Sequence, residues 1–477
     1  MKEARLPSLL EVCCVLAAFL AVVFSFTALL ELPIQLALFV GWFIVMLLGL
    51  RLGFTYDSLQ GSIIKGISNG LEAVIILMAV GALIGTWIAG GVVPTIIYYG
   101  LDFIHPSIFL LATLIICALT SLSTGTSWGT VGTAGIAMMG IGEGLGLPLP
   151  LVAGAVLSGA YFGDKLSPLS DSTVLAASMS KVNVISHVKS MLYLDVPAFI
   201  ITAILFTGAG FYHGSGNIDL DRVQSIMTSL NDTFNISPLM LAPAVIVIGL
   251  LIMKKPSIPT ISFGALVGII WAVLFQNADV VSSIETAYNG FQISSGSEFI
   301  DELLNRGGIS GMLGSIAVII LGLGIGGMLE KVGVLTVIMN TFVDKIKNAG
   351  SLSVSTIFTG LFTNIFGCAM YVSLILTPKL MESSYDRLHI DRRVLSRNTE
   401  VGGTMTSGMV PWSDNGIFMA GILGVSTLSY LPFMWMSFVS IALVIIYGYT
   451  GKFIWYTDGA ETEIETDMEE DVSDIAK

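Results

Sequence analysis

The chain has 477 residues, of which 54% are hydrophobic and only 12% are charged. Soluble domains carry roughly 25% charged residues, so this composition excludes an ordinary soluble protein and indicates one that is dissolved in a lipid bilayer. The net charge is −13, but residues 458–477 hold nine acids and one lysine, which leaves −5 for the rest of the chain.

Long apolar runs predict about ten membrane-spanning helices. We expect them at residues 8–30, 33–50, 70–90, 151–180, 191–212, 238–253, 258–276, 310–329, 400–425 and 431–450. Two further apolar regions, 107–140 and 352–381, are interrupted by Gly, Ser, Thr and Asn. Such interruptions indicate broken helices or re-entrant hairpins. The expected fold is an all-α polytopic membrane protein with two hairpins.

Lysine and arginine residues concentrate in alternate loops, which predicts an orientation. The groups are Lys2 and Arg5; Arg51 and Lys65; Lys181 and Lys189; Lys254 and Lys255; Lys331, Lys345 and Lys347; Arg387, Arg392, Arg393 and Arg397; and Lys452. With two re-entrant hairpins, all of these groups fall on one side, and the other loops are acidic or neutral. We therefore expect a bacterial inner-membrane protein with both termini in the cytoplasm.

The first apolar run is too long for a cleavable signal peptide and reads as the first span. The four cysteines lie in apolar runs and are expected to be buried thiols. The acidic tail is expected to be a disordered, solvated segment, with a regulatory role as the alternative.

Two halves of the chain match at a nearly fixed offset. GTWIAGG at 85–91 lies opposite GMLEKVG at 327–333, and the Pro-X-Ser-Asp elements that end at Asp171 and Asp414 are 243 residues apart. The loop charges place the starts of the two repeats on opposite sides, so the repeats are expected to be inverted, as in alternating-access transporters.

This repeat divides the chain into five parts. They are two N-terminal spans (1–60); a first repeat (61–212) with hairpin 107–140 and broken helix 151–180; connecting loops and two spans (213–301); a second repeat (302–452) with hairpin 352–381 and broken helix 400–425; and the acidic tail (453–477).

Asp171 and Asp414 are the leading candidates for binding Na⁺ or a proton, since ionisable groups at membrane depth are costly. Each follows a proline that frees backbone carbonyls, and oxygen-bearing neighbours would complete a site for a hard cation. These neighbours are Ser170, Thr173, Ser413 and Asn415. The alternative is that each aspartate only caps a helix. Asp171 is expected to be the primary site.

Asp164 and Lys165 have no counterpart in the second repeat, so they are expected either to form an ion pair or to take part in proton coupling. Arg397 and Glu400 could pair at the foot of the ninth span. The hairpin tips are expected to hold an organic anion on hydroxyls and free N–H groups. The residues are Ser123, Thr124, Thr126, Ser127, Thr363 and Asn364. Packing of small residues is the alternative.

Residues 159–173, GAYFGDKLSPLSDST, resemble the signature of the NhaC-type Na⁺/H⁺ antiporters, within the ion transporter superfamily. GTWIAGGVVP at 85–94, TGTSWGT at 124–130 and SGMVPWSDN at 407–415 are similar to the malate/lactate antiporter branch of Bacillus type. The resemblance implies Na⁺/H⁺ exchange, and for this branch uptake of malate with protons against export of Na⁺ with lactate. It also implies frequent dimers.

The sequence therefore predicts a secondary transporter with Na⁺ and H⁺ as coupling ions, no cofactor and no nucleic-acid partner. A plain Na⁺/H⁺ antiporter without an organic substrate is the first alternative, and a channel or sensor is the second. We find no nucleophile–base constellation, Walker loop or zinc signature, so an enzyme is not expected.

Overall fold

The computed structural model describes residues 4–457, apart from 104, 169, 215–219, 254, 295–300, 302–303 and 344–345. Within these residues the architecture is helical, and the sole β contact is an isolated bridge between Ile390 and Tyr456. Most of the acidic tail lies outside the described residues, as do Lys254 and Lys345.

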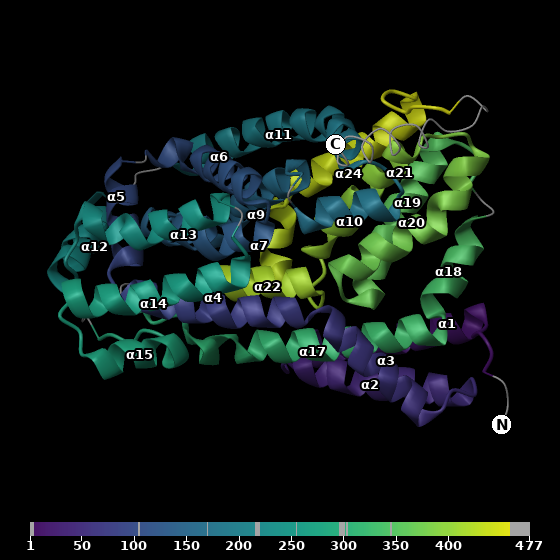
Figure 1. Ribbon diagram of the computed structural model, residues 1–477, viewed down its shortest axis with the longest axis horizontal. Coiled ribbons are helices and arrows are strands. Elements are labelled where there is room, and N and C mark those ends of the chain that lie inside the picture. Colours follow the sequence, from purple (N-terminus) through teal and green to yellow (C-terminus); the bar gives the residue numbers. More distant parts are fainter. Residues whose placement is uncertain are drawn as a thin grey trace, which may run out of the picture.

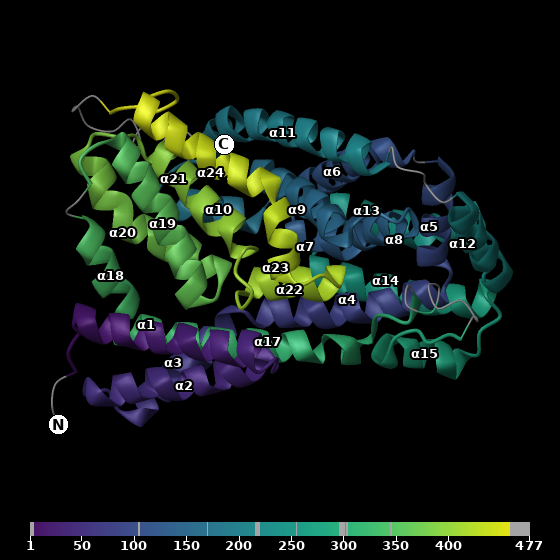
Figure 2. The same ribbon diagram turned by 180° about the vertical axis from the view of Figure 1, so that it is seen from behind.

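Helices follow one another in three groups (Figures 1 and 2). The first group is α1 (Leu9–Phe24), α2 (Ile34–Arg51), α3 (Tyr56–Asn69), α4 (Leu71–Ala89), α5 (Val92–Phe103), α6 (Pro106–Thr124), α7 (Ser127–Thr130), α8 (Ile136–Gly144), α9 (Leu149–Leu166), α10 (Asp171–Met179) and α11 (Val184–Gly214). The connecting group is α12 (Leu220–Thr233), α13 (Ala242–Ile252), α14 (Ser257–Phe275) and α15 (Val280–Asn289). The last group is α17 (Gly308–Val332), α18 (Val334–Val343), α19 (Ala349–Gly367), α20 (Met370–Arg387), α21 (Arg392–Glu400), α22 (Asp414–Leu423), α23 (Thr427–Tyr430) and α24 (Trp435–Thr450).

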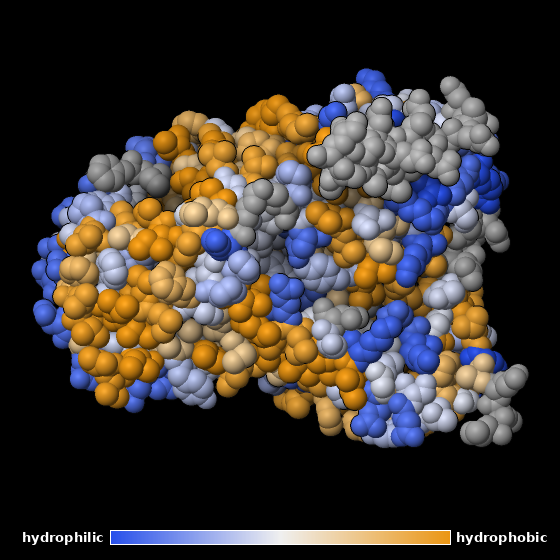
Figure 3. Space-filling model, in the orientation of Figure 1, coloured by the Kyte–Doolittle hydropathy of each residue, from blue (hydrophilic) through white to orange (hydrophobic). Residues whose placement is uncertain are grey.

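Seven of the described helices are long and apolar enough to cross a membrane, or up to ten if each bent pair is counted as one span. Apolar side chains cover much of the middle of the face in Figure 3, and hydrophilic ones gather at both ends. Exposed residues of this kind include Ile200 and Ile204 on α11 and Leu266 and Leu274 on α14. Lipid tails would cover such a surface, and the prediction of an all-α membrane protein is confirmed.

The two halves repeat at the level of the backbone. Helices α6 and α19 begin 243 residues apart and end 243 residues apart, and the same offset separates the starts of α9 and α21 and of α10 and α22. A side-chain hydrogen bond repeats as well. Ser121 donates to the carbonyl of Ala160 at 2.6 Å, and its counterpart Asn364 donates to the carbonyl of Gly403 at 2.6 Å.

The repeated helices run in opposite directions where they meet. Gly70, at the start of α4, packs against Leu323, and Gly85 near its end packs against Gly308. Helix α17 therefore runs antiparallel to its counterpart α4, which agrees with an inverted relationship of the halves.

Each half contains a helical hairpin whose tip is a residue in the left-handed region. Gly125 (φ 71°) separates α6 from α7 and α8, and Cys368 (φ 57°) separates α19 from α20. The return arms lie along the outgoing arms. Gly142 packs against Phe109 in the first hairpin, and the hydroxyls of Thr356 and Tyr385 are 3.1 Å apart in the second.

Two predicted spans differ from the structure. The broken helix expected at 400–425 starts at Arg392, because its first turns carry polar and charged residues that hydropathy does not detect. The span expected at 238–253 is a helical stretch, Pro238–Ile252, made of a 3-10 turn and α13, and it qualifies as a span only together with part of α12, from which it is bent by 86°. Its Leu251 packs against Gly129, close to the first hairpin tip. The turn with Lys255 therefore does not lie with the other basic loops, contrary to the prediction.

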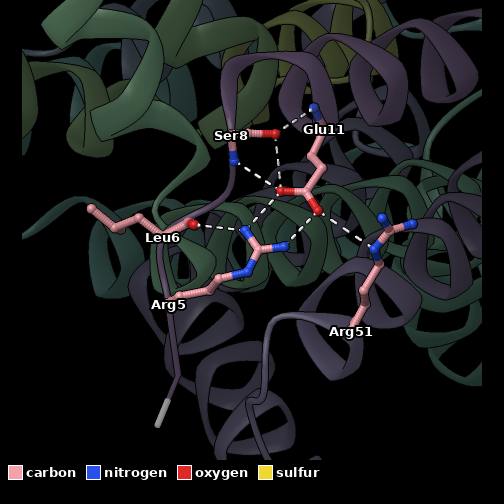
Figure 4. Close-up of polar contacts among 5 residues, drawn as sticks. All are labelled: Arg5, Leu6, Ser8, Glu11 and Arg51. Carbon is pink, nitrogen blue, oxygen red and sulfur yellow. Dashed lines mark hydrogen bonds and ion pairs between the residues drawn. The ribbon is translucent and has the colours of Figure 1, made fainter. Parts of the chain in front are cut away.

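Those basic loops gather at one end of the molecule, at the right of Figure 1. There the Arg5 amide donates to the Leu52 carbonyl, and Lys181 pairs with Glu382 at 2.7 Å. Figure 4 shows the carboxylate of Glu11 between Arg5 and Arg51, at 2.7 and 3.4 Å. Ser8 and Glu11 also form a capping box that fixes the start of α1.

Candidate ion and substrate site

The first hairpin tip is capped by Asp164, at the end of α9. Ser127, the first residue of α7, donates its hydroxyl to Asp164 Oδ2 at 2.6 Å, and Ser170 donates to Oδ1 at 2.6 Å. The Asp164 side chain is buried. A carboxylate is favourable here because the helix N-terminus carries partial positive charge.

The second hairpin tip is capped by Asp414, at the start of α22. The backbone N–H of Met370, the first residue of α20, donates to both carboxylate oxygens at 3.1 and 3.2 Å. The Asp414 N–H in turn donates to the carbonyl of Cys368 at 2.9 Å. Asp414 is also buried. The two return arms thus each receive a carboxylate at their N-terminus, but from positions that are not repeat counterparts.

Trp128 connects the first hairpin to the second half. Its indole N–H donates to Asn415 Oδ1, and its ring stacks on Phe418 with centroids 4.7 Å apart. Asn415 then donates from Nδ2 to Ser407 Oγ at 2.5 Å. Ser127, which binds Asp164, and Trp128, which binds Asn415, are consecutive residues. This segment therefore links Asp164 to Asn415, the residue beside Asp414.

Asp171 lies in a different environment from Asp414. Its side chain is exposed, and Tyr371 of the second hairpin donates its hydroxyl to Oδ2. The structure does not bring Asp171 and Asp414 together; it brings Asp164 and Asp414 to the two hairpin tips. The roles predicted for these aspartates remain predictions.

The other predicted cation ligands lie in two different places, beside Asp164 and at the start of α22. Ser170 contacts Asp164, and Thr173 donates to the carbonyls of Asp164 and Lys165 at 3.2 and 3.3 Å. Ser413 instead accepts from the Gly416 N–H at 3.0 Å and caps α22.

The predicted substrate residues also differ in exposure between the two hairpins. In the first tip, Ser123 is exposed and donates to its own helix, and Thr126 caps α7. In the second hairpin, Thr363 donates to Ser373 at 2.9 Å and Asn364 binds the broken helix. Both are fully buried, which fits the packing alternative better than contact with a substrate. Thr124 is partly buried and lies at a long 3.5 Å from the Ser121 carbonyl.

Both predicted ion pairs have other partners. Lys165 binds Asp195 of α11 at 2.9 Å, with both side chains fully buried, and does not pair with Asp164. Arg397 donates to the Phe453 carbonyl at 3.0 Å and does not pair with Glu400. Asp195 was not predicted from the sequence. The signal that could have identified it as a candidate is a charged residue inside a long apolar helix.

Glu400 is a fourth buried carboxylate, which the sequence placed only at the foot of a span. Ser172 and Thr404 donate to its Oε1 at 3.0 and 2.8 Å. No three His, Cys, Asp or Glu side chains cluster among the residues that the structure covers. A cation site here would therefore combine single carboxylates with hydroxyl, amide and carbonyl oxygens.

A cavity of about 540 Å³ opens at the end opposite the basic loops. Its lining includes Arg306, Asn305 and the C-terminal end of α22 around Gly424. Arg306 pairs with Glu143 at 3.1 Å on its wall. Because Asp414 begins α22 and Gly424 follows its end, this helix separates the cavity from the second hairpin tip.

The chain is 70% identical over 465 residues to the malate-2H⁺/Na⁺-lactate antiporter of Bacillus subtilis (strain 168), which covers 98% of this chain and 99% of that protein. It is 36% identical over 437 residues to the Na⁺/H⁺ antiporter NhaC of Alkalihalophilus pseudofirmus, covering 91% and 94% of the two chains. It is 35% identical over 416 residues to the arginine/ornithine antiporter ArcD of Halobacterium salinarum, covering 87% and 86%.

Residues 159–452, more than half of the chain, match the Na⁺/H⁺ antiporter family. With the relatives above, this match shows that the chain is a secondary transporter that belongs to the Na⁺/H⁺ antiporter family.

Proposed function

We propose that this protein exchanges external malate and protons for internal Na⁺ and lactate. The 70% identity over nearly the full length to a malate-2H⁺/Na⁺-lactate antiporter supports this substrate set. The more distant relatives are named for other exchanged species, so the substrate set is not common to all of them.

The observation that carries the proposal is the pair of buried carboxyls at the two hairpin tips, Asp164 and Asp414, with Trp128 and Asn415 between them. In inverted-repeat transporters, substrate and coupling ions bind near the midplane where broken helices meet. We propose that Na⁺ and H⁺ compete for the carboxylate and hydroxyl oxygens here. Asp171 opens to solvent and would line the access path.

The organic anion is proposed to bind at the first tip, where Ser123 and Thr124 are not fully buried. Lys255, exposed on the turn that follows α13, would supply a positive charge for one carboxylate. We further propose that the end with the basic loops faces the cytoplasm, and that the repeats 61–212 and 302–452 form the transport unit.

Uptake of labelled L-malate into proteoliposomes that contain lactate and Na⁺ tests this function. We expect uptake to require both internal solutes and to increase with an inward proton gradient. Na⁺-driven proton movement without any malate uptake would leave a plain Na⁺/H⁺ antiporter and overturn the substrate assignment.

A further inference from the structure

A chain of hydroxyls connects the two buried carboxyls Asp164 and Glu400. Ser170 Oγ lies 2.6 Å from Asp164 Oδ1, Ser170 and Ser172 hydroxyls lie 3.0 Å apart, and Ser172 Oγ lies 3.0 Å from Glu400 Oε1. All four side chains are buried. Asp164 and the serines belong to the first half and Glu400 to the second, so the chain crosses between halves.

Counting hydrogens shows that this chain is one proton short when both carboxyls are ionised. Its three contacts each need one hydrogen, and the two serine hydroxyls supply two. If Ser170 donates to Asp164 and Ser172 donates to Glu400, the 3.0 Å contact between the serines has none. A proton on either carboxyl supplies the third hydrogen and aligns both hydroxyls in one direction.

Burial of the network also favours a proton on one of the two carboxyls. Two ionised carboxylates in one buried network would each lose hydration and would repel each other. The nearby charged groups do not offset the cost of ionising both Asp164 and Glu400. Lys165 on α9 is already paired with Asp195 on α11, Arg397 on α21 binds the Phe453 carbonyl, and Asp171 on α10 adds negative charge.

We infer that Asp164 and Glu400 share a single proton, which passes between them through Ser170 and Ser172. In one transfer the O–H bond of Glu400 Oε1 breaks and an O–H bond forms at Asp164 Oδ1. Each serine accepts one hydrogen and gives up its own, so atoms and charge balance.

This inference deepens the proposed function and rests on it for its role in transport. Na⁺ beside Asp164 would require that carboxyl to be ionised, which places the shared proton on Glu400. Return of the proton to Asp164 would displace the cation. Glu400 is thus a proton-carrying group, and Ser170 and Ser172 are positioning residues for its transfer.

Amide substitutions should trap the two arrangements. The amide of Glu400→Gln can donate to Ser172, which aligns both hydroxyls toward ionised Asp164. The amide of Asp164→Asn can donate to Ser170 and aligns them toward ionised Glu400. Neither variant needs a proton to complete the chain, so both should fold. In each, the purified protein should lose the same infrared C=O band of a protonated carboxyl.

The infrared test needs no transported substrate and is therefore independent of the proposed function. Persistence of every protonated-carboxyl band in both variants would overturn the shared proton. Glu285→Gln, on an exposed position of α15, is the matched control and should keep all bands.

Transport provides the second readout. In proteoliposomes, Glu400→Gln lacks the proton whose return to Asp164 would displace Na⁺, so proton-driven exchange should slow at least about tenfold. Ser172→Ala keeps both carboxyls and should slow proton-driven exchange at least about tenfold, while proton-independent malate–malate exchange is much less affected. Ser178→Ala, on the exposed face of the same helix, is the control. A wild-type rate of proton-driven exchange in Glu400→Gln would refute the inference.

Discussion

Trp128 and Tyr371 are repeat counterparts, 243 residues apart, and each donates a hydrogen bond from the tip of its own hairpin to the broken helix of the other half. Trp128 reaches Asn415, and Tyr371 reaches Asp171. Both aromatic residues directly follow the first residue of the return arm. Each hairpin is therefore hydrogen-bonded to the broken helix of the other half. If one repeat moves against the other, either these hydrogen bonds break or the bonded segments move together.

Removing either donor should slow exchange without unfolding the protein. Trp128→Phe keeps a ring to stack on Phe418, and Tyr371→Phe keeps its ring as well. A single hydrogen bond contributes about 0.5–1.5 kcal/mol, so we expect initial exchange rates in proteoliposomes to change by roughly twofold to tenfold. Trp271→Phe on α14 removes an indole donor elsewhere and is the control. Equal rates in Trp128→Phe and Trp271→Phe would contradict a role for this contact.

Substitutions of Asp164, Asp171 and Asp414 should differ in effect according to the positions of these residues. Asp414→Asn and Asp164→Asn replace buried carboxyls at hairpin tips and should abolish Na⁺-dependent proton movement. Asp171→Asn changes an exposed group and should leave measurable activity with weaker apparent Na⁺ affinity. Dye-monitored pH changes at several Na⁺ concentrations would decide this. Complete loss in Asp171→Asn alone would restore Asp171 as the primary site, as the sequence suggested.

The repeat was predictable from sequence because its markers are local: two Pro-X-Ser-Asp elements and two segments bounded by glycines. The partner of each charged residue was not predictable. Lys165 is beside Asp164 in sequence, but a helix directs consecutive side chains about 100° apart, and Lys165 reaches Asp195 on a different helix. Arg397 and Glu400 are three residues apart, yet tertiary packing gives each another partner.

The hydropathy pattern failed for a related reason. Helix α21 carries Arg392, Arg393, Arg397 and Glu400 and reads as a loop, although Arg397 and Glu400 are fully buried. Polar side chains inside a helical protein are satisfied by other helices, and a single-sequence hydropathy window cannot detect those partners. The same limit concealed the relay to Glu400, three of whose four residues the sequence had already placed at the first broken helix.

The buried Lys165–Asp195 pair should contribute to stability only as a pair. Lys165→Met or Asp195→Leu alone leaves an unpaired buried charge, which costs about 3–5 kcal/mol. Each single variant should therefore melt well below the wild type in detergent. The double variant removes both charges and should recover much of the loss. A double variant no more stable than the single ones would show that the pair is not the cause.

Lys255 distinguishes organic-anion transport from cation exchange. Lys255→Gln removes a positive charge near the first hairpin tip but touches no carboxyl of the proposed cation site. We expect the KM for malate to rise several-fold and Na⁺-dependent proton movement without malate to remain near the wild-type rate. Lys452→Gln, after the last span, is the matched lysine control. An unchanged KM would remove Lys255 from the substrate site.

Close packing of α6 on α9 positions Asp164, and Gly163 sets that distance. A methyl group on Gly163 would lie 2.4 Å from both the Ala118 carbonyl and the Leu122 nitrogen, so Gly163→Ala must push the two helices apart and move Asp164 away from Ser127. Alanine is favoured over glycine by about 1 kcal/mol within a helix. Gly208→Ala on α11, where nothing lies within 4 Å, should therefore be neutral or slightly stabilising in thermal melts. Gly163→Ala should instead lower the melting temperature in the same measurement, and the variant should lose exchange activity. A stabilised, fully active Gly163→Ala protein would show that the site does not depend on this contact.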